Sequence, residues 1–275
     1  MRPEIQFRTA ARTLRAHKWC RVDHVPPGLW RVLLAERCLT RLAHGVTTTI
    51  EDAYRAVDAI DRRARFLTRT YNTLFLSICG FAGVEVALFK SGLAERIASV
   101  LLGGSWLIVL GAFMLVSWFG SRVAARSESM GAQIGALSLY VVAEAIVFVP
   151  LLYMADAYAP GAIQSAALVT IVAFAGLTAI AWQTKKDFSF LGGMLRWGGI
   201  LALVLIGASV VFGFQLGTFF SVAMVGFAGA AILYDTSNIL REYPEDRYIS
   251  AALQLFASVA LMFWYVLRIF MGSRR

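Results

Sequence analysis

Three carboxylic acids and one arginine interrupt stretches of this 275-residue chain that are otherwise strongly apolar. The acids are Glu85, Glu144 and Asp235, and the arginine is Arg268. A charged side chain in the hydrocarbon of a bilayer costs at least about 2.5 kcal/mol, so such residues are usually paired or functional. A carboxylate in that setting can hold a proton or a cation, and Glu85 and Arg268 are candidates for a structural pairing.

Asp235 is the most informative of these residues because a second polar stripe matches it. Asn238 lies at the edge of its helical face, and the last apolar run carries Gln254 and Ser258 on one face. Polar faces on consecutive antiparallel helices should meet, since contact with lipid would leave both unsatisfied. We therefore predict a proton or ion site from these four residues, with Glu144 deeper in the bilayer. Two interpretations of Asp235 stay open: a titratable site, or a hydrogen bond that only stabilises the last helix.

Patterns for other chemistry are not visible in the sequence. The spacing His17-x2-Cys20-x3-His24 is not that of a zinc site. Three cysteines without a CxxC pair imply no disulfide framework. We find no Ser-His-Asp set, HExxH, phosphate-binding loop or glycine-rich nucleotide motif. We therefore expect neither an enzyme nor a metal or cofactor.

Apolar runs of about the 20 residues that a bilayer requires follow one another from Tyr71 onward. We predict seven spans, at residues 71–89, 97–119, 131–154, 162–183, 197–214, 217–239 and 249–271. Hydrophobic residues make up 59% of the chain, charged residues 16%, and the mean hydropathy is +0.66. A soluble core cannot absorb that much apolar surface. The composition predicts an all-α polytopic membrane protein and excludes soluble enzymes, disordered chains and disulfide scaffolds.

The first quarter of the chain is basic. Residues 1–70 hold 14 of the 26 lysine and arginine residues but only 7 of the 17 acidic ones. We assign residues 1–65 to an N-terminal region and residues 66–275 to the membrane domain. Apolar residues at helical spacing over 29–46 predict an amphipathic helix, on the membrane surface or packed against the protein. No nucleic-acid-binding module accompanies the charge, so the bilayer is the expected partner.

The connections between spans predict the orientation. The second, fourth and sixth connections are basic, whereas the third and fifth contain no lysine or arginine. Cytoplasmic loops carry an excess of positive charge. We therefore place the N-terminus and the even-numbered connections in the cytoplasm, although Arg268, Arg274 and Arg275 near the opposite end of the last span argue against this orientation.

Two segments, Thr184-Lys-Lys-Asp-Phe-Ser-Phe-Leu-Gly-Gly-Met194 and Ile232-Leu-Tyr-Asp-Thr-Ser-Asn-Ile239, resemble hallmark segments of the Bax inhibitor-1 family. Weaker likeness comes from Phe66-Leu-Thr-Arg-Thr-Tyr71 and from Ala252-Leu-Gln-Leu-Phe256 with Leu267-Arg268. The resemblance covers about residues 66–271. It implies a seven-helix bundle in which the other six helices enclose the last one.

The resemblance also implies a function. Some members of the family are described as pH-sensitive calcium leak channels, in which the aspartate of the Leu-Tyr-Asp segment shares a proton with an aspartate on the last helix. Asp235 matches the first aspartate, but Ser258 stands where the second is expected. The shared-proton contact therefore cannot form in that way here.

Serine at position 258, with Thr-Ser-Asn after Asp235, resembles a proteobacterial branch of the family. One member of that branch binds and modulates a membrane-anchored AAA protease of the FtsH type through its N-terminal segment. Two hypotheses follow: a calcium leak or proton-sensing channel, and a regulatory partner of such a protease that uses residues 1–65. The same resemblance implies a bacterial inner membrane.

Overall fold

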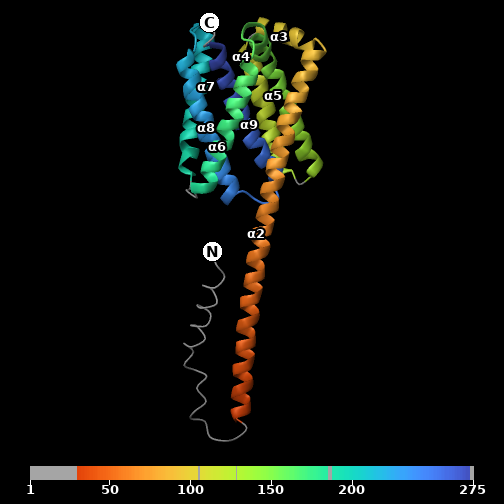
Figure 1. Ribbon diagram of the computed structural model, residues 1–275, viewed down its shortest axis with the longest axis vertical. Coiled ribbons are helices and arrows are strands. Elements are labelled where there is room, and N and C mark those ends of the chain that lie inside the picture. The colour runs from red at the N-terminus through yellow and green to blue at the C-terminus, as the bar shows by residue number, and fades with distance from the viewer. Residues whose placement is uncertain (1–29, 105, 128, 185–187, 273–275) are drawn as a thin grey trace. The chain divides into compact units, whose positions relative to one another are not determined.

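The computed structural model describes residues 30–104, 106–127, 129–184 and 188–272, and its regular secondary structure over these residues is entirely helical (Figure 1). The helices are α2 (Trp30–Lys90), α3 (Leu93–Gly103), α4 (Trp106–Arg126), α5 (Met130–Tyr158), α6 (Ala162–Thr184), α7 (Phe190–Phe212), α8 (Thr218–Arg241) and α9 (Tyr248–Gly272). Of the described helices, seven are long and apolar enough to cross a membrane. The prediction of an all-α polytopic protein with seven spans is confirmed.

The second span lies further along the chain than the predicted 97–119, which was wrong at both ends. The chain turns at Gly92, whose φ is 73°, and the 11-residue helix α3 then ends where Gly104 adopts an extended backbone. Glycine accepts a positive φ because it has no Cβ. The apolar run is thereby divided into a short helix and the spanning helix α4. Hydropathy alone joined the two because both are apolar.

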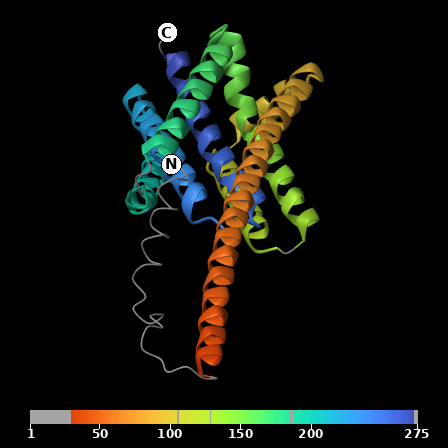
Figure 2. The same cartoon turned by 60° about the horizontal axis from the view of Figure 1, so that its bottom comes forward.

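The last helix runs through the middle of the unit formed by residues 63–275 (Figures 1 and 2). It packs directly on α4, α5, α6 and α8, and Leu255 and Leu267 on it are fully buried. Helices that are apolar all round need such enclosure or lipid contact. The central position of the last helix, which the family resemblance implied, is confirmed.

Residues 1–62 form a unit of their own. Their described backbone, from Trp30, is the first part of α2, so the predicted helix over 29–46 is present. Side chains of residues 30–50 lie outside the described part of the structure, as do His17, Cys20 and His24.

Arg63 ties α2 to the connection between α8 and α9, residues 242–247. Its guanidinium donates hydrogen bonds to the carbonyl oxygens of Ile239 and Tyr243, both at 2.6 Å. Carbonyls at a helix C-terminus lack partners within the helix, and the helix dipole favours a cation there. Arg63 therefore caps the end of α8.

An arginine of this α8–α9 connection caps α4. Arg247 donates to the carbonyl oxygen of Ala125 in the last turn of that helix. The Tyr243 hydroxyl donates to Oγ of Ser250 at 2.7 Å, and burial raises the pKa of this phenol, which keeps it a donor. The ends of α4 and α8 and the start of α9 thus lie together at one end of the bundle.

Candidate functional site

The hydroxyl of Ser258 donates a hydrogen bond to Oδ2 of Asp235 at 2.6 Å. Asp235 comes from α8 and Ser258 from α9, which pack against each other. Ser258 is only 8% exposed, and Asp235 is half-buried. The structure therefore brings the two polar stripes together at this pair, with a neutral hydroxyl facing the carboxylate.

Small residues let α8 come close to its neighbours at this level. Ala228 is fully buried, and a Cβ at Gly229 would lie 3.4 Å from Leu177 of α6 and 3.6 Å from Met262 of α9. Small residues at helix interfaces allow the close approach on which packing in membranes depends. This face of α8 is consequently seated between α6 and α9.

The two hallmark segments also contact each other, which positions Asp235 from the other side. A Cβ at Gly192 would lie 2.9 Å from the ring of Tyr234, closer than real side chains come, so the ring packs directly on the glycine. The amide of Phe188 donates to Oγ of Ser237 at 3.4 Å. The turn of α8 that carries Asp235 is thus held by the start of α7.

Two members of the predicted site do not contact Asp235. Gln254 is exposed, and Asn238 is half-buried with its carbonyl accepting the amide of Glu242 at 2.9 Å. Within the described residues, neither side chain makes a hydrogen bond to Asp235. The helical wheel gives the angle of a side chain but not its distance to the neighbouring helix, so a part for these two residues in a proton or ion site stays a prediction.

Glu144 lies on α5 and lines a cavity of about 650 Å³ between α4, α5, α7, α8 and α9. Its side chain is only 7% exposed, and one carboxylate oxygen has no hydrogen-bond partner. Tyr140, one turn earlier on α5, contacts the carboxyl group through its hydroxyl. Glu144 therefore lines a mostly apolar chamber and keeps one carboxylate oxygen buried without a partner.

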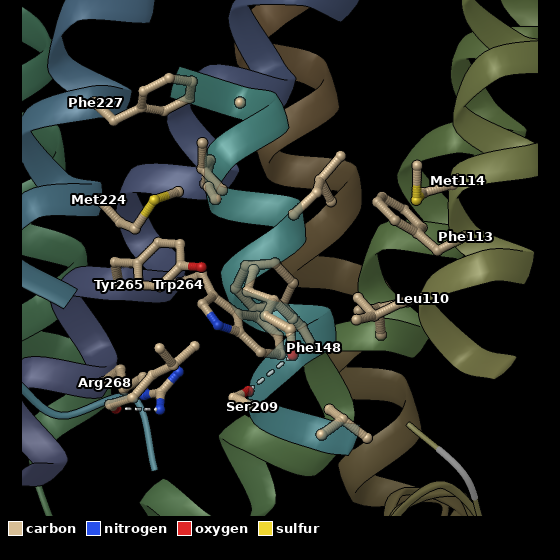
Figure 3. A pocket seen from close by; sticks show the side chains of 18 of the residues that line it. Leu110, Phe113, Met114, Phe148, Ser209, Met224, Phe227, Trp264, Tyr265 and Arg268 are labelled. Atoms are coloured by element: carbon tan, nitrogen blue, oxygen red, sulfur yellow. Dashed lines mark hydrogen bonds between the residues drawn. The ribbon is translucent and has the colours of Figure 1, made fainter. Parts of the chain in front are cut away.

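The cavity is lined largely by aromatic and aliphatic side chains, with few polar groups (Figure 3). Arg268 and Ser209 lie toward one end of it, Phe227 toward the other, and Trp264 and Phe148 between them. A second hollow of about 480 Å³ shares Arg268 and Trp264 with the first and extends along the start of α8. The chamber around Glu144 thus reaches the α7–α8 connection.

The predicted pairing of Glu85 with Arg268 was wrong. Arg268 donates to the carbonyl oxygen of Leu216 in the α7–α8 connection at 2.9 Å. Glu85 is buried on α2, and both of its carboxylate oxygens lack a hydrogen-bond partner. The two charged residues lie in different environments, which helix-by-helix reasoning does not reveal.

Sequence reasoning missed the cavity itself. A signal for it exists on α7, where Gly199, Ala202 and Ser209 recur at helical spacing and all line the cavity. Such a stripe also fits close helix packing, so it does not distinguish a cavity from an interface. Over the described residues, no three His, Cys, Asp or Glu side chains lie close enough to hold a metal ion.

Comparison with known proteins adds the family. The family model described as inhibitor of apoptosis-promoting Bax1 matches residues 63–275, which is the compact membrane unit. The chain belongs to the Bax inhibitor-1 family. Both hallmark segments and the Asp235–Ser258 contact lie within the matched range.

Several curated relatives share part of this Bax inhibitor-1 domain. An uncharacterized protein of Pseudomonas aeruginosa is 38% identical over 111 residues, which cover 39% of this chain and 49% of the relative. Bax inhibitor 1 of Schizosaccharomyces pombe is 35% identical over 112 residues, 39% of this chain and 41% of that protein. LIFEGUARD 4 of Arabidopsis thaliana is 35% identical over 119 residues, 40% and 47% respectively. The chain thus spans about half the length of the curated relatives it matches.

Proposed function

We propose that this protein is a cation leak pathway in which Glu144 holds the permeating ion or proton partway across the bundle. The observation that supports the proposal is the cavity of about 650 Å³ that is lined by Glu144, one of whose carboxylate oxygens is buried and unpartnered. Such an oxygen in apolar surroundings is unfavourable unless a proton or a cation satisfies it. Calcium takes six to eight oxygen ligands, far more than this lining offers, so a calcium ion there would keep water and bind weakly.

Aromatic rings close the proposed pathway between Glu144 and the end of the bundle where α9 begins. Tyr140 lies 5.9 Å from Phe113 and 6.1 Å from Phe256 between ring centroids. Since Tyr140 precedes Glu144 by one turn, this aromatic layer separates the cavity from the end of the bundle where α9 begins. The proposed leak is therefore closed in the described conformation.

The Asp235–Ser258 hydrogen bond is the proposed latch of that closed state. Ser258 follows Phe256 by two residues on α9, so its hydrogen bond to Asp235 on α8 also holds the aromatic layer in place. Because Ser258 is neutral, the latch lacks the second carboxylate that would couple it strongly to pH. We propose that this latch itself depends only weakly on pH near neutrality.

The test is calcium and proton flux into proteoliposomes that contain the full chain. Glu144→Gln keeps the side-chain shape and removes the charge, and we expect flux to fall roughly tenfold or more. Glu85→Gln is the matched control, because Glu85 is also buried and unpartnered but does not line the cavity. Equal loss in both variants, or no flux in the wild-type protein, would contradict the leak pathway.

Regulation of a membrane-anchored AAA protease of the FtsH type is the second candidate function. It is supported by the exposed side chains of α2 between Tyr54 and Arg62, which precede the Bax inhibitor-1 domain. Exposed N-terminal segments are where proteases engage a chain. Co-purification of the protease with the full chain, lost on removal of residues 1–62 while flux is unchanged or absent, would favour this function.

A further inference from the structure

The N-terminal half of α2 carries an uninterrupted heptad repeat. Apolar residues occupy nine successive a and d positions, namely Leu39, Ala43, Val46, Ile50, Ala53, Val57, Ile60, Ala64 and Leu67. They are spaced alternately four and three residues apart over four heptads. A repeat sustained over three to four heptads is typical of a coiled coil rather than of a helix on a globular core.

The nine a and d residues form an apolar seam along the helix, and charged residues lie almost entirely outside it. From Arg37 to Arg62 every charged residue except Asp61 falls at b, c or f, the positions that face away from a coiled-coil partner. Asp58 and Arg62 form an ion pair one turn apart on that outer face. The polar side of the helix is therefore satisfied by solvent and by its own charges, and the seam is the side that needs a partner.

The structure shows where the seam is covered and where it is not. In the same register, Leu67 packs on the core of the membrane unit, and Leu74 is only 2% exposed. Further toward the N-terminus, Val57 is 58% exposed and Ile60 is 68% exposed. One apolar stripe thus continues from an established interface onto a helix surface over residues 54–62 that the described part of the chain leaves exposed.

We propose that a second copy of this chain covers the seam, so that residues 39–64 of two molecules form a parallel two-stranded coiled coil. Copies in one membrane share one orientation, which makes a parallel pairing the natural one. The central a positions, Ile50 and Val57, are β-branched, which favours two strands in parallel coiled coils.

The flanking positions also accept this partner. In a parallel pair, g of one helix faces e of the next heptad in the other, which sets Asp61 opposite Ala56. Like charges therefore never face each other across the seam. Small residues at Ala43, Ala53 and Ala64 let the two helices approach closely. The proposal does not depend on the leak pathway.

Cysteine cross-linking of the full chain in native membranes tests the proposal. In a background with Cys20, Cys38 and Cys79 changed to serine, Val57→Cys and Ile60→Cys place thiols in the seam. Arg55→Cys and Asp58→Cys are the matched controls on the outer face. A parallel in-register pair brings equivalent a or d residues within disulfide range, whereas f and b residues stay apart.

We expect the seam cysteines to give a product of twice the 30.2 kDa chain mass in at least about tenfold higher yield than the outer-face cysteines. A seam product of any other mass would mean that a different protein covers the seam, and would overturn the proposal. Equal yields from both faces, or monomer throughout, would overturn it as well. Val57→Lys with Ile60→Lys should also convert the detergent-solubilised dimer to monomer in light scattering, and a dimer that persists would contradict the coiled coil.

Discussion

At the residue scale, the chemistry of the α8–α9 contact depends on one hydroxyl group. Two carboxylates in contact would titrate as a coupled pair, but Ser258 gives Asp235 a neutral donor at 2.6 Å. The surroundings of a buried acid likewise depend on its position, as Glu144 and Glu85 show. Both are buried acids on apolar helices, yet only Glu144 lines the cavity.

Ser258→Asp should therefore introduce the missing coupling. Provided that the new carboxylate reaches Asp235, we expect flux to become steeply pH-dependent between about pH 6 and 8, because two like charges in contact resist ionising together. Wild-type flux should lack this Asp235-dependent step. Flux in proteoliposomes as a function of pH measures both, with Ser258→Ala as the control that adds no charge. A steep, Asp235-dependent transition already present in the wild-type protein would show that another acid, such as Glu144, supplies the coupling.

At the scale of elements, glycine decides how closely α7 approaches α8. The Tyr234 ring occupies the space where a side chain at position 192 would begin, whereas a Cβ at Gly193 would meet nothing within 4 Å. Through this contact the start of α7 packs directly on α8, although the two segments lie far apart in the sequence. The absence of a side chain at Gly192 leaves room for the Tyr234 ring.

Gly192→Val should force the two helices apart and destabilise the bundle by about 1 to 3 kcal/mol, the usual cost of overpacking. Unfolding in a denaturing detergent titration measures this cost. Gly193→Val is the matched control, with the same change in volume and helix propensity, and should cost less. If both variants lost the same stability, helix propensity rather than the Tyr234 contact would be responsible.

The hydrogen bonds by which Arg63 caps the end of α8 also act between helices. Arg63→Ala removes two charge-assisted hydrogen bonds at the end of α8, and we expect a loss of about 3 kcal/mol of unfolding free energy. Arg69→Ala is the comparison, because Arg69 lies 5.9 Å over the ring of Tyr248, an interaction worth about 0.5–1 kcal/mol. The same detergent titration applies, and similar losses for the two variants would refute the cap.

At the scale of the whole membrane unit, positive charge gathers at one end. Arg63 caps the end of α8 and Arg247 the end of α4, and the sequence of the α6–α7 connection contains Lys185 and Lys186. The third and fifth connections contain no lysine or arginine. By the positive-inside rule we expect the basic end to face the cytoplasm.

A topology reporter inserted after Lys186 should therefore report the cytoplasm, and one inserted after Pro160 should report the outside. With the chain expressed in bacteria, alkaline phosphatase and green fluorescent protein fusions, which are active on opposite sides of a bacterial inner membrane, measure this directly. Both insertions on the same side would refute the seven-span arrangement. An exchange of the two sides would keep the spans and reverse the orientation.

The sequence alone was enough for the class of protein, the number of spans and the pairing of Asp235 with Ser258. Each depends on local information, because hydropathy, helical periodicity and the order of neighbouring helices can all be read along the chain. The break at Gly104 was visible as two successive glycines, but a glycine costs only about 1 kcal/mol in a helix and rarely decides its end alone.

Only the tertiary structure decided the rest. The cavity around Glu144 needs the rotation and depth of five helices at once, and no single helix carries that information. The partner of Arg268 proved to be a backbone carbonyl in a connection, which has no side-chain signal in the sequence. Gln254 and Ser258 are four residues apart on one helical face, yet one is exposed and the other is buried against Asp235. The physical reason is that helix packing is set by the sum of many small contacts, whereas a helix face is set by its own residues.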